Sequence, residues 1–265
     1  MTAGDQATAS RVVQIKPSVR IALLGGFDLI VNDVPVTAPV GSRRLLAFVA
    51  LNHRTPVPRS LIAGSLWPKV PEHCAYTNLR AALCRLRGLG TRALDITATD
   101  VRLAPDVTVD VHDARMLAQH LLDPCVPAMA LGLSTATVDQ LSADLLPGWY
   151  DEWALLEADH WRQLRLHALE ALTETFIDAT EYAGAVVAAQ AAVQADPLRE
   201  SSQASLIRAY LAEGNPSEAV HHFERYVRRL RDELGLCPTQ RLHQLVARVR
   251  WAGDGDAALR RRSRW

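Results

Sequence analysis

The sequence contains no long apolar run. None of its stretches approaches the roughly 18–20 consecutive apolar residues that cross a bilayer. Residues 1–18 are small and polar, and they lack the hydrophobic centre of a secretory signal. These absences argue against a membrane-spanning or exported protein. We therefore predict a cytoplasmic chain with no membrane partner, in which residues 1–18 are a disordered N-terminus.

Cysteine is scarce, and its spacing does not indicate a site. The four cysteines, Cys74, Cys84, Cys125 and Cys237, form no C-x-x-C pair. The adjacent histidines 221 and 222 would project about 100° apart from a helix, so they cannot easily share a metal ion. With 265 residues, 49% of them hydrophobic, the chain can build a core without a disulfide scaffold. We expect ordinary thiols, no metal ion and no cofactor.

The chain also lacks a nucleotide-binding loop. The segment "LLGGFDL" has neither the G-x-G-x-x-G spacing nor the Lys-Ser/Thr pair of a phosphate-binding loop, which favours a β-turn. The acids of "YDEWALLEADHW" could suggest a hydrolase with paired carboxylates. They are spread along a predicted helix without an evident cleft, so we interpret them as a solvated acidic face above buried tryptophans. An enzyme with an acidic cleft is the remotest alternative.

Acidic residues are nearly absent from residues 41–92. That segment has nine basic side chains and one acid, Glu72, although the formal net charge of the whole chain is zero. Residues 106–200 carry sixteen acids and four bases, and residues 201–265 carry twelve bases and seven acids. This segregation predicts that the basic block meets a polyanion, whereas the acidic block faces away from it or meets a basic protein surface.

The predicted elements of the first half follow the order of a winged helix-turn-helix. Residues 19–39 read as two or three short strands, with turns at residues 25–26 and 32–33. Three helices follow in "SRRLLAFVALNH", with Ser42 as N-cap, "PRSLIAGSLWP" and "EHCAYTNLRAALCRLRGLG". The segment "ALDITATDVRLAP" then alternates as a β-hairpin. The fold class is therefore mainly α, with an α+β N-terminal domain.

The third predicted helix presents arginines opposite its apolar stripe. A helical projection places Ala75, Leu79, Ala82, Leu83 and Leu86 on one side. The opposite face has small side chains at its centre and longer polar side chains around them. This arrangement suits a helix that enters the DNA major groove. The predicted DNA-binding residues on this helix are Thr77, Asn78, Arg80, Arg85 and Arg87.

Two flanking segments could add DNA contacts. Arg43 and Arg44 would lie in the first turn of their helix, where a phosphate would offset the unfavourable dipole. Alternatively, they cover the neighbouring sheet with their aliphatic stems. Thr97, Thr99 and Arg102 of the hairpin either reach the DNA backbone or minor groove or are plain surface positions.

The second half is predicted to be an all-α, tetratricopeptide-like domain. Phe176 and Tyr210 lie 34 residues apart, as do Ala185 and Ala219, and this period is typical of stacked helix-turn-helix repeats. Two copies of the repeat are fewer than the three or so that a stable stack needs. Helices at 150–172 and 239–251 would therefore complete or cap the stack. We predict the winged-helix domain at 19–106, the helical domain at 107–251 and a basic tail at 252–265.

These segments resemble a known family. An arginine-bearing helix ending in "RLR", preceded by "SRRLLAFVALNH" and "LIAGSLWP", resembles the OmpR-type DNA-binding domain of SARP regulators, which activate antibiotic gene clusters. "LLPGWYDEWALLEADHWRQLRLHALEAL", "DPLRE" and "YLAEGNPSEAVHHFERYVRRLRDELGLCPTQRLHQLV" are similar to the bacterial transcriptional activator domain that follows it there. The resemblance covers roughly residues 19–250. Similar wings carry Gly-Tyr where this chain has Asp100-Val101.

The resemblance implies a DNA-binding transcriptional activator and not an enzyme. Such a protein would bind direct repeats near the −35 region as a side-by-side homodimer and recruit RNA polymerase holoenzyme. By position, residues 72–89 would be the recognition helix and residues 93–104 the wing. The alternative is a protein-binding scaffold with a tetratricopeptide-like surface and a winged helix that does not bind DNA.

Overall fold

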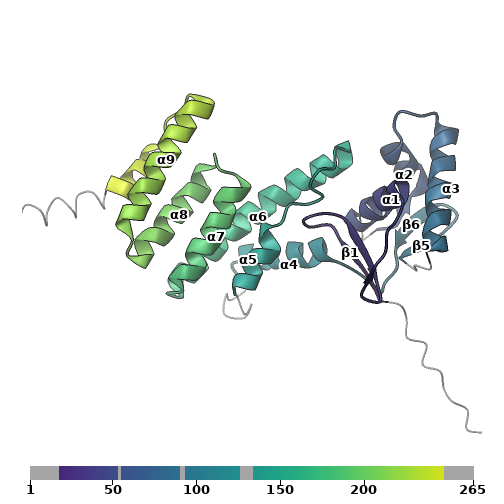
Figure 1. The fold of residues 1–265 in the computed structure, drawn as a ribbon, viewed down its shortest axis with the longest axis horizontal. Coiled ribbons are helices and arrows are strands. Elements are labelled where there is room, and N and C mark those ends of the chain that lie inside the picture. The colour runs from purple at the N-terminus through teal and green to yellow at the C-terminus, as the bar shows by residue number, and fades with distance from the viewer. Residues whose placement is uncertain (1–17, 53–54, 90–92, 126–133, 248–265) are drawn as a thin grey trace, which may run out of the picture. The chain divides into compact units, whose positions relative to one another are not determined.

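The computed structural model describes residues 18–52, 55–89, 93–125 and 134–247 (Figure 1). The basic tail predicted at 252–265 and nearly all of the predicted disordered N-terminus lie outside the described residues. The chain divides into two compact units. The first consists of residues 1–22 and 27–109, and the second of residues 23–26 and 110–265.

The first unit opens with the predicted short strands. β1 (Val19–Ala22) pairs antiparallel with β2 (Asp28–Val31), which pairs with β3 (Val34–Pro35). A further strand, β7 (Val107–Val109), runs parallel to β1 and completes the order β3-β2-β1-β7. The sequence pattern did not predict β7, and after this strand the chain enters the longer segment of the second unit at Asp110.

Three helices and a second sheet give this unit the predicted winged helix-turn-helix order. The helices are α1 (Val40–Leu51), α2 (Arg59–Leu66) and α3 (Glu72–Gly88). β5 (Leu94–Ile96) and β6 (Asp100–Leu103) form the hairpin, and β4 (Val57–Pro58) adds to β6 in the order β4-β6-β5. The sheet thus anchors the hairpin at the start of α2.

The start of α1 differs from the prediction. The helix begins at Val40 after Pro39, whose φ of −59° suits a helix entry, so the assignment of Ser42 as N-cap was wrong. Ser42 is fully buried, and its hydroxyl donates a hydrogen bond to the carbonyl oxygen of Ala82 in α3, at 3.1 Å. The serine therefore satisfies a polar contact inside the core rather than capping a helix.

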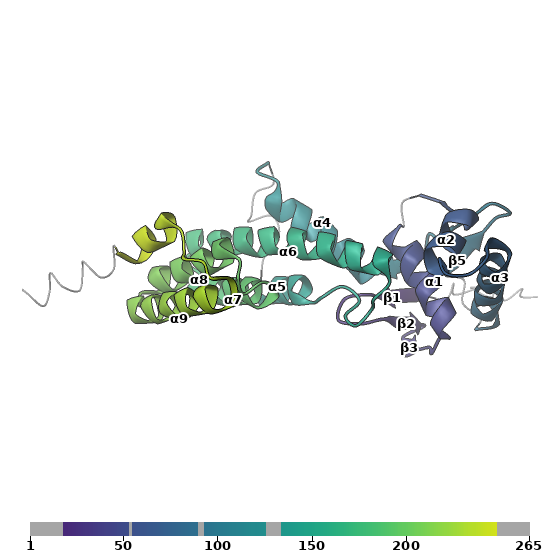
Figure 2. The same ribbon diagram turned by 90° about the horizontal axis from the view of Figure 1, so that it is seen from above.

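The named elements among the described residues of the second unit are all helices. The unit comprises α4 (Asp110–Leu122), α5 (Thr135–Ser142), α6 (Glu152–Asp178), α7 (Tyr182–Ala195), α8 (Glu200–Glu213) and α9 (Pro216–Leu234), and residues 240–247 are also helical. Helices α6 to α9 lie side by side, each packed against the next (Figures 1 and 2). This arrangement confirms the tetratricopeptide-like prediction.

The 34-residue period corresponds to two helix pairs, α6 with α7 and α8 with α9. Ala185 in α7 and Ala219 in α9 are both fully buried. The turns match as well, because Thr180 and Gly214, again 34 residues apart, both have positive φ values, of 60° and 87°. After α9, Leu242 packs into the same core as Phe223, Tyr226 and Leu230, so residues 240–247 cap the stack as expected.

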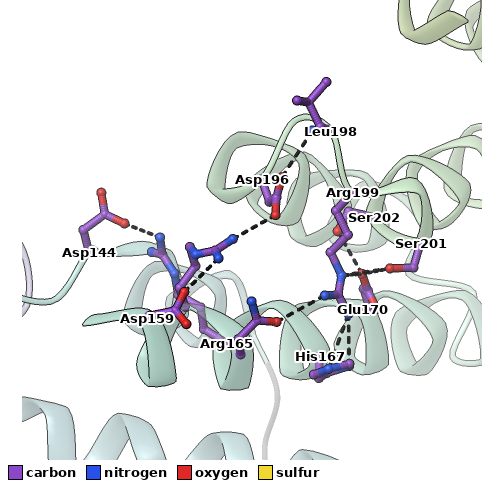
Figure 3. A network of polar contacts seen from close by, with 12 residues as sticks. Asp144, Asp159, Arg165, His167, Glu170, Asp196, Leu198, Arg199, Ser201 and Ser202 are labelled. Carbon is purple, nitrogen blue, oxygen red and sulfur yellow. Dashed lines mark hydrogen bonds and ion pairs between the residues drawn. The ribbon is translucent and has the colours of Figure 1, made fainter. Parts of the chain in front are cut away.

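The "DPLRE" motif, Asp196 to Glu200, joins the two pairs through polar contacts (Figure 3). From α6, Arg162 bonds to the Asp196 carboxylate at 2.8 Å, and Glu170 accepts from Arg199 at 2.9 Å. Burial alone would raise the pKa of Glu170, but hydrogen bonds from Arg199 and two α8 serines outweigh it and lower that pKa. The motif therefore has a structural role between repeats.

The same described ranges contain neither a membrane-spanning helix nor a cluster of metal ligands. None of the helices there combines the length and apolar character of a membrane span. Within those ranges, no three His, Cys, Asp or Glu side chains are grouped as a metal site requires. The four cysteines are free thiols.

Candidate nucleic-acid interface

The apolar stripe of α3 holds this helix on the core of the first unit. The helix packs against α1 and α2. Each residue of the predicted stripe is at most 5% exposed, which confirms the projection: Ala75, Leu79, Ala82, Leu83 and Leu86. The stripe therefore decides which face of α3 is turned to solvent.

The opposite face of α3 is exposed and cationic. Asn78, Arg80, Arg85 and Arg87 are all exposed. Among the residues that the structure describes, the three arginines form no ion pair or hydrogen bond with another side chain. Arg80 and Arg87 are seven residues apart, or about 10 Å along the helix axis. Thr77 is exposed too, and its hydroxyl donates to the carbonyl oxygen of His73 at 2.9 Å.

Several acids of the second unit are paired with arginines of that unit. Arg115 bonds to Glu157 at 2.6 Å, Arg208 to Glu174 at 2.7 Å, and Arg165 to Asp144. Each of these three carboxylates therefore has an arginine partner within its own unit. A cationic face whose arginines form no ion pair among the described residues is suited to a polyphosphate.

The structure gives Arg43 and Arg44 different surroundings from those predicted. Because α1 begins at Val40, they occupy its fourth and fifth positions, so the first-turn dipole argument does not apply to them. Arg44 donates to the carbonyl oxygen of Leu66, the last residue of α2, at 2.7 Å. Both side chains are half-buried. Their contact with DNA stays a prediction. Arg44 also has a structural role, because its hydrogen bond joins α1 to the end of α2.

The side chains of the wing, residues 93–104, are engaged with one another. The Thr97 hydroxyl oxygen accepts from the amide of Asp100 at 2.9 Å, and the Thr99 hydroxyl donates to the Asp100 carboxylate. Arg102 pairs with Asp95 across the hairpin at 3.2 Å. The wing therefore has two acids and one base, and its predicted DNA contacts stay untested.

Arg59, the first residue of α2, is a residue that the sequence interpretation overlooked. Its amide donates to Thr99 at 2.8 Å, and its guanidinium lies 3.4 Å from the carbonyl oxygen of Ala98. Both acceptors belong to the turn of the wing. A signal was present in the sequence, because Arg59 is one of the nine bases of the 41–92 block.

The wing acids give a test of how close the wing comes to DNA. Substituting Asp95→Asn removes a negative charge and releases Arg102, so we expect DNA affinity to rise about two- to fivefold at low salt. The ion pair is about half exposed, so stability should change by less than about 1 kcal/mol. Fluorescence anisotropy with labelled duplex DNA measures the affinity, and Asp113→Asn, an exposed acid of α4, is the matched control. If the unsubstituted chain and both variants bind DNA with equal affinity, the wing does not contact the DNA.

Known proteins resemble this chain in sequence and in fold. The family model described as "Bacterial transcriptional activator domain" matches residues 110–250. The regulatory protein AfsR of Streptomyces coelicolor is 27% identical over 241 residues, which is 86% of this chain and 24% of AfsR. The solved structure of Mycobacterium tuberculosis EmbR in complex with a low affinity phosphopeptide has a TM-score of 0.69 and 23% identity, over 88% of this chain and 65% of that chain. This chain thus spans about a quarter of AfsR, and its likeness to EmbR is one of fold.

Proposed function

The chain belongs to the bacterial transcriptional activator domain family, and from this premise we propose that it is a sequence-specific DNA-binding transcriptional activator. Its recognition as a SARP-family regulator from sequence motifs agrees with the matches to AfsR and EmbR. The observation that carries the proposal is the cationic face of α3, which is exposed, unpaired within the described residues and backed by a buried leucine stripe. In this proposal α3 enters the major groove.

Finer roles follow from the same proposal. Thr77, Asn78, Arg80, Arg85 and Arg87 contact bases or phosphates from α3, and the protein binds direct repeats near the −35 region as a homodimer. Direct repeats are related by translation, so the contact between the two copies is head to tail rather than two-fold symmetric. The bound pair recruits RNA polymerase at promoters of a secondary-metabolite gene cluster.

A salt titration of DNA binding tests the proposal. Each neutralised phosphate contributes a slope of about −0.9 in a plot of log K against log salt. Phosphate contacts from two or three arginines of α3 should therefore give a slope of about −2 to −3, and other basic residues of the block would steepen it. The measurement uses the full chain and duplexes selected from a random pool. Undetectable binding at 50 mM salt, or a flat dependence, would contradict the proposal.

One observation favours a second candidate function, a protein-binding scaffold. A groove of about 770 Å³ lies along α6, α8 and residues 239–245. Its lining includes Glu174, Arg208 and Arg241. Grooves on stacked helix pairs commonly bind extended peptides. The same salt titration separates the two candidates, because a scaffold does not require DNA binding.

A further inference from the structure

The turn between the two strands of the wing is held from outside the hairpin by one residue. We call residues 97–99 the wing turn. The side chains of Thr97, Ala98 and Thr99 are all exposed, so packing does not fix this turn. Among the described residues, the hydrogen bonds that link the wing turn to the chain beyond the hairpin all end at Arg59. The place of the turn in the first unit therefore depends on Arg59.

Three consecutive carbonyl oxygens of the wing turn contact Arg59. The amide of Arg59 donates to the carbonyl oxygen of Thr99 at 2.8 Å, which is an ordinary hydrogen-bond length. The guanidinium nitrogen Nη1 lies 3.4 Å from the carbonyl oxygen of Ala98 and 3.5 Å from that of Thr97. These two contacts are long, but the guanidinium charge attracts the negative ends of both carbonyl dipoles. Arg59 thus holds the turn through its main chain and its side chain.

The wing turn is also closed on itself. The amide of Thr97 donates to the carbonyl oxygen of Asp100 at 2.9 Å. The Thr97 hydroxyl oxygen accepts from the amides of Thr99 and Asp100, at 3.3 Å and 2.9 Å. Such a turn keeps its local shape through its own hydrogen bonds. Arg59 accordingly determines where the turn lies rather than how it is folded.

Arg59 joins the wing turn to the helix that supports α3. It is the first residue of α2, and α2 packs directly against α3. The strand before it, β4, pairs with β6 over two positions only, Val57 with Val101 and Pro58 with Asp100. The Nε atom of Arg59 is buried, so the guanidinium group starts against the protein surface. Through α2, the wing turn and the cationic face of α3 belong to one frame.

We propose that Arg59 is a positioning residue that holds the wing turn where it contacts the same DNA duplex as α3. In this role Arg59 acts through residues 97–99 and does not itself contact DNA. Contacts that are already in place bind more tightly, because less freedom is lost on binding. The inference rests on the proposed function and assigns a part in DNA binding to a residue outside α3.

Hydrogen exchange in the free chain tests whether Arg59 holds the wing turn. Arg59→Met keeps most of the aliphatic length but removes the charge and the side-chain donors. The amide of residue 59 remains and reports directly on its bond to Thr99, so its protection factor should fall about tenfold. The matched control is Arg20→Met, which removes an exposed arginine of β1 in the same unit. This control should leave the protection of the residue 59 amide unchanged.

DNA binding by the same full-length chains tests whether the position of the turn matters. Arg59→Met should raise the Kd for the selected duplex about three- to tenfold, mainly through faster dissociation, whereas Arg20→Met should not. The slope of log K against log salt should change by less than about 0.3, because no phosphate contact is lost. Fluorescence anisotropy measures both quantities.

Arg59→Lys is the conservative variant. It keeps the charge and a donor that reaches one carbonyl oxygen, so its Kd should lie between those of the unsubstituted chain and Arg59→Met. Circular dichroism checks the melting temperature of each variant. If methionine at position 59 lowers that temperature, the lysine variant alone carries the comparison, and a Kd equal to that of the unsubstituted chain together with a lower protection factor would count against the proposal.

Four outcomes would overturn the inference: unchanged protection of the residue 59 amide, unchanged DNA affinity of Arg59→Met, an equal loss of affinity in Arg20→Met, or a salt slope smaller by about 0.9. The last result would place Arg59 on a phosphate. If the unsubstituted chain does not bind DNA at all, the proposed function fails and the DNA part of this inference fails with it. If that chain binds DNA and Arg59→Met binds equally well, only this inference fails.

Discussion

Replacing Arg80→Ala should weaken binding to the selected duplex by about 1–3 kcal/mol, or roughly 5- to 150-fold. Arg80 is exposed near the middle of the cationic face of α3 and forms no internal ion pair within the described residues, so its removal costs the fold little. If Arg80 pairs with a base through two hydrogen bonds, the loss is confined to duplexes with the preferred base at one position. Fluorescence anisotropy on duplexes with each of the four bases at every position measures both quantities.

The control for this prediction is Arg228→Ala. Arg228 is an exposed arginine of α9, so its removal changes the net charge by the same amount outside the proposed interface. An equal weakening of every duplex by Arg80→Ala, with a salt slope smaller by about 1, would place Arg80 on a phosphate instead of a base. If both variants bind as the unsubstituted chain does, α3 is not the recognition helix.

The orientation of α3 was predictable because it depends on short-range periodicity alone. Its leucines and alanines repeat with the helical period, and burial of that stripe leaves only one orientation for the arginines. The repeat in the second half was predictable for a similar reason, since Phe176 and Tyr210 recur at a fixed spacing. In both cases, local pattern and tertiary packing agree.

Pairing of long polar side chains could not be predicted in the same way. The acceptor of Arg44 is a backbone carbonyl 22 positions away, at the end of α2, and its place depends on how α1 and α2 pack. The ion pair of Arg102 with Asp95 required the register of the hairpin, which the sequence left open. These contacts decide which predicted site residues are free to reach a ligand, so the site was less predictable than the fold.

The sequence also did not reveal which segments of the chain make up the second unit. The Asp110 carboxylate accepts hydrogen bonds from the amides of Leu23, at 2.9 Å, and Leu24, at 3.0 Å. Burial raises the pKa of Asp110, although these hydrogen bonds act to lower it. Residues 23–26 therefore belong to the second unit although they lie between two strands of the first. A turn signal such as Gly25-Gly26 predicts the turn but not the acid that binds it.

Replacing Arg165→Met should lower the free energy of unfolding of the second unit by about 2–4 kcal/mol. Arg165 is 2% exposed in α6, and its guanidinium donates to the carbonyl oxygen of Ser142 and to Asp144. Burial lowers the pKa of Arg165, and the attraction of Asp144 acts against that shift. Methionine fills much of the same volume but leaves the Ser142 carbonyl without its donor, which is the main cost. Urea unfolding followed by tryptophan fluorescence measures the change.

The matched variant, Asp144→Asn, separates the two contacts of Arg165. The Asp144 side chain is 68% exposed and remains hydrated without its partner, so this change should cost less than about 1 kcal/mol. If Asp144→Asn were as destabilising as Arg165→Met, the ion pair rather than the Ser142 carbonyl would anchor the residues after α5. That anchoring has a wider effect, because the Gly25 amide donates to the Asp144 carbonyl oxygen at 2.8 Å. A loosened 142–146 segment should therefore also speed hydrogen exchange at Gly25 and Leu146, whose amides bond within this connection.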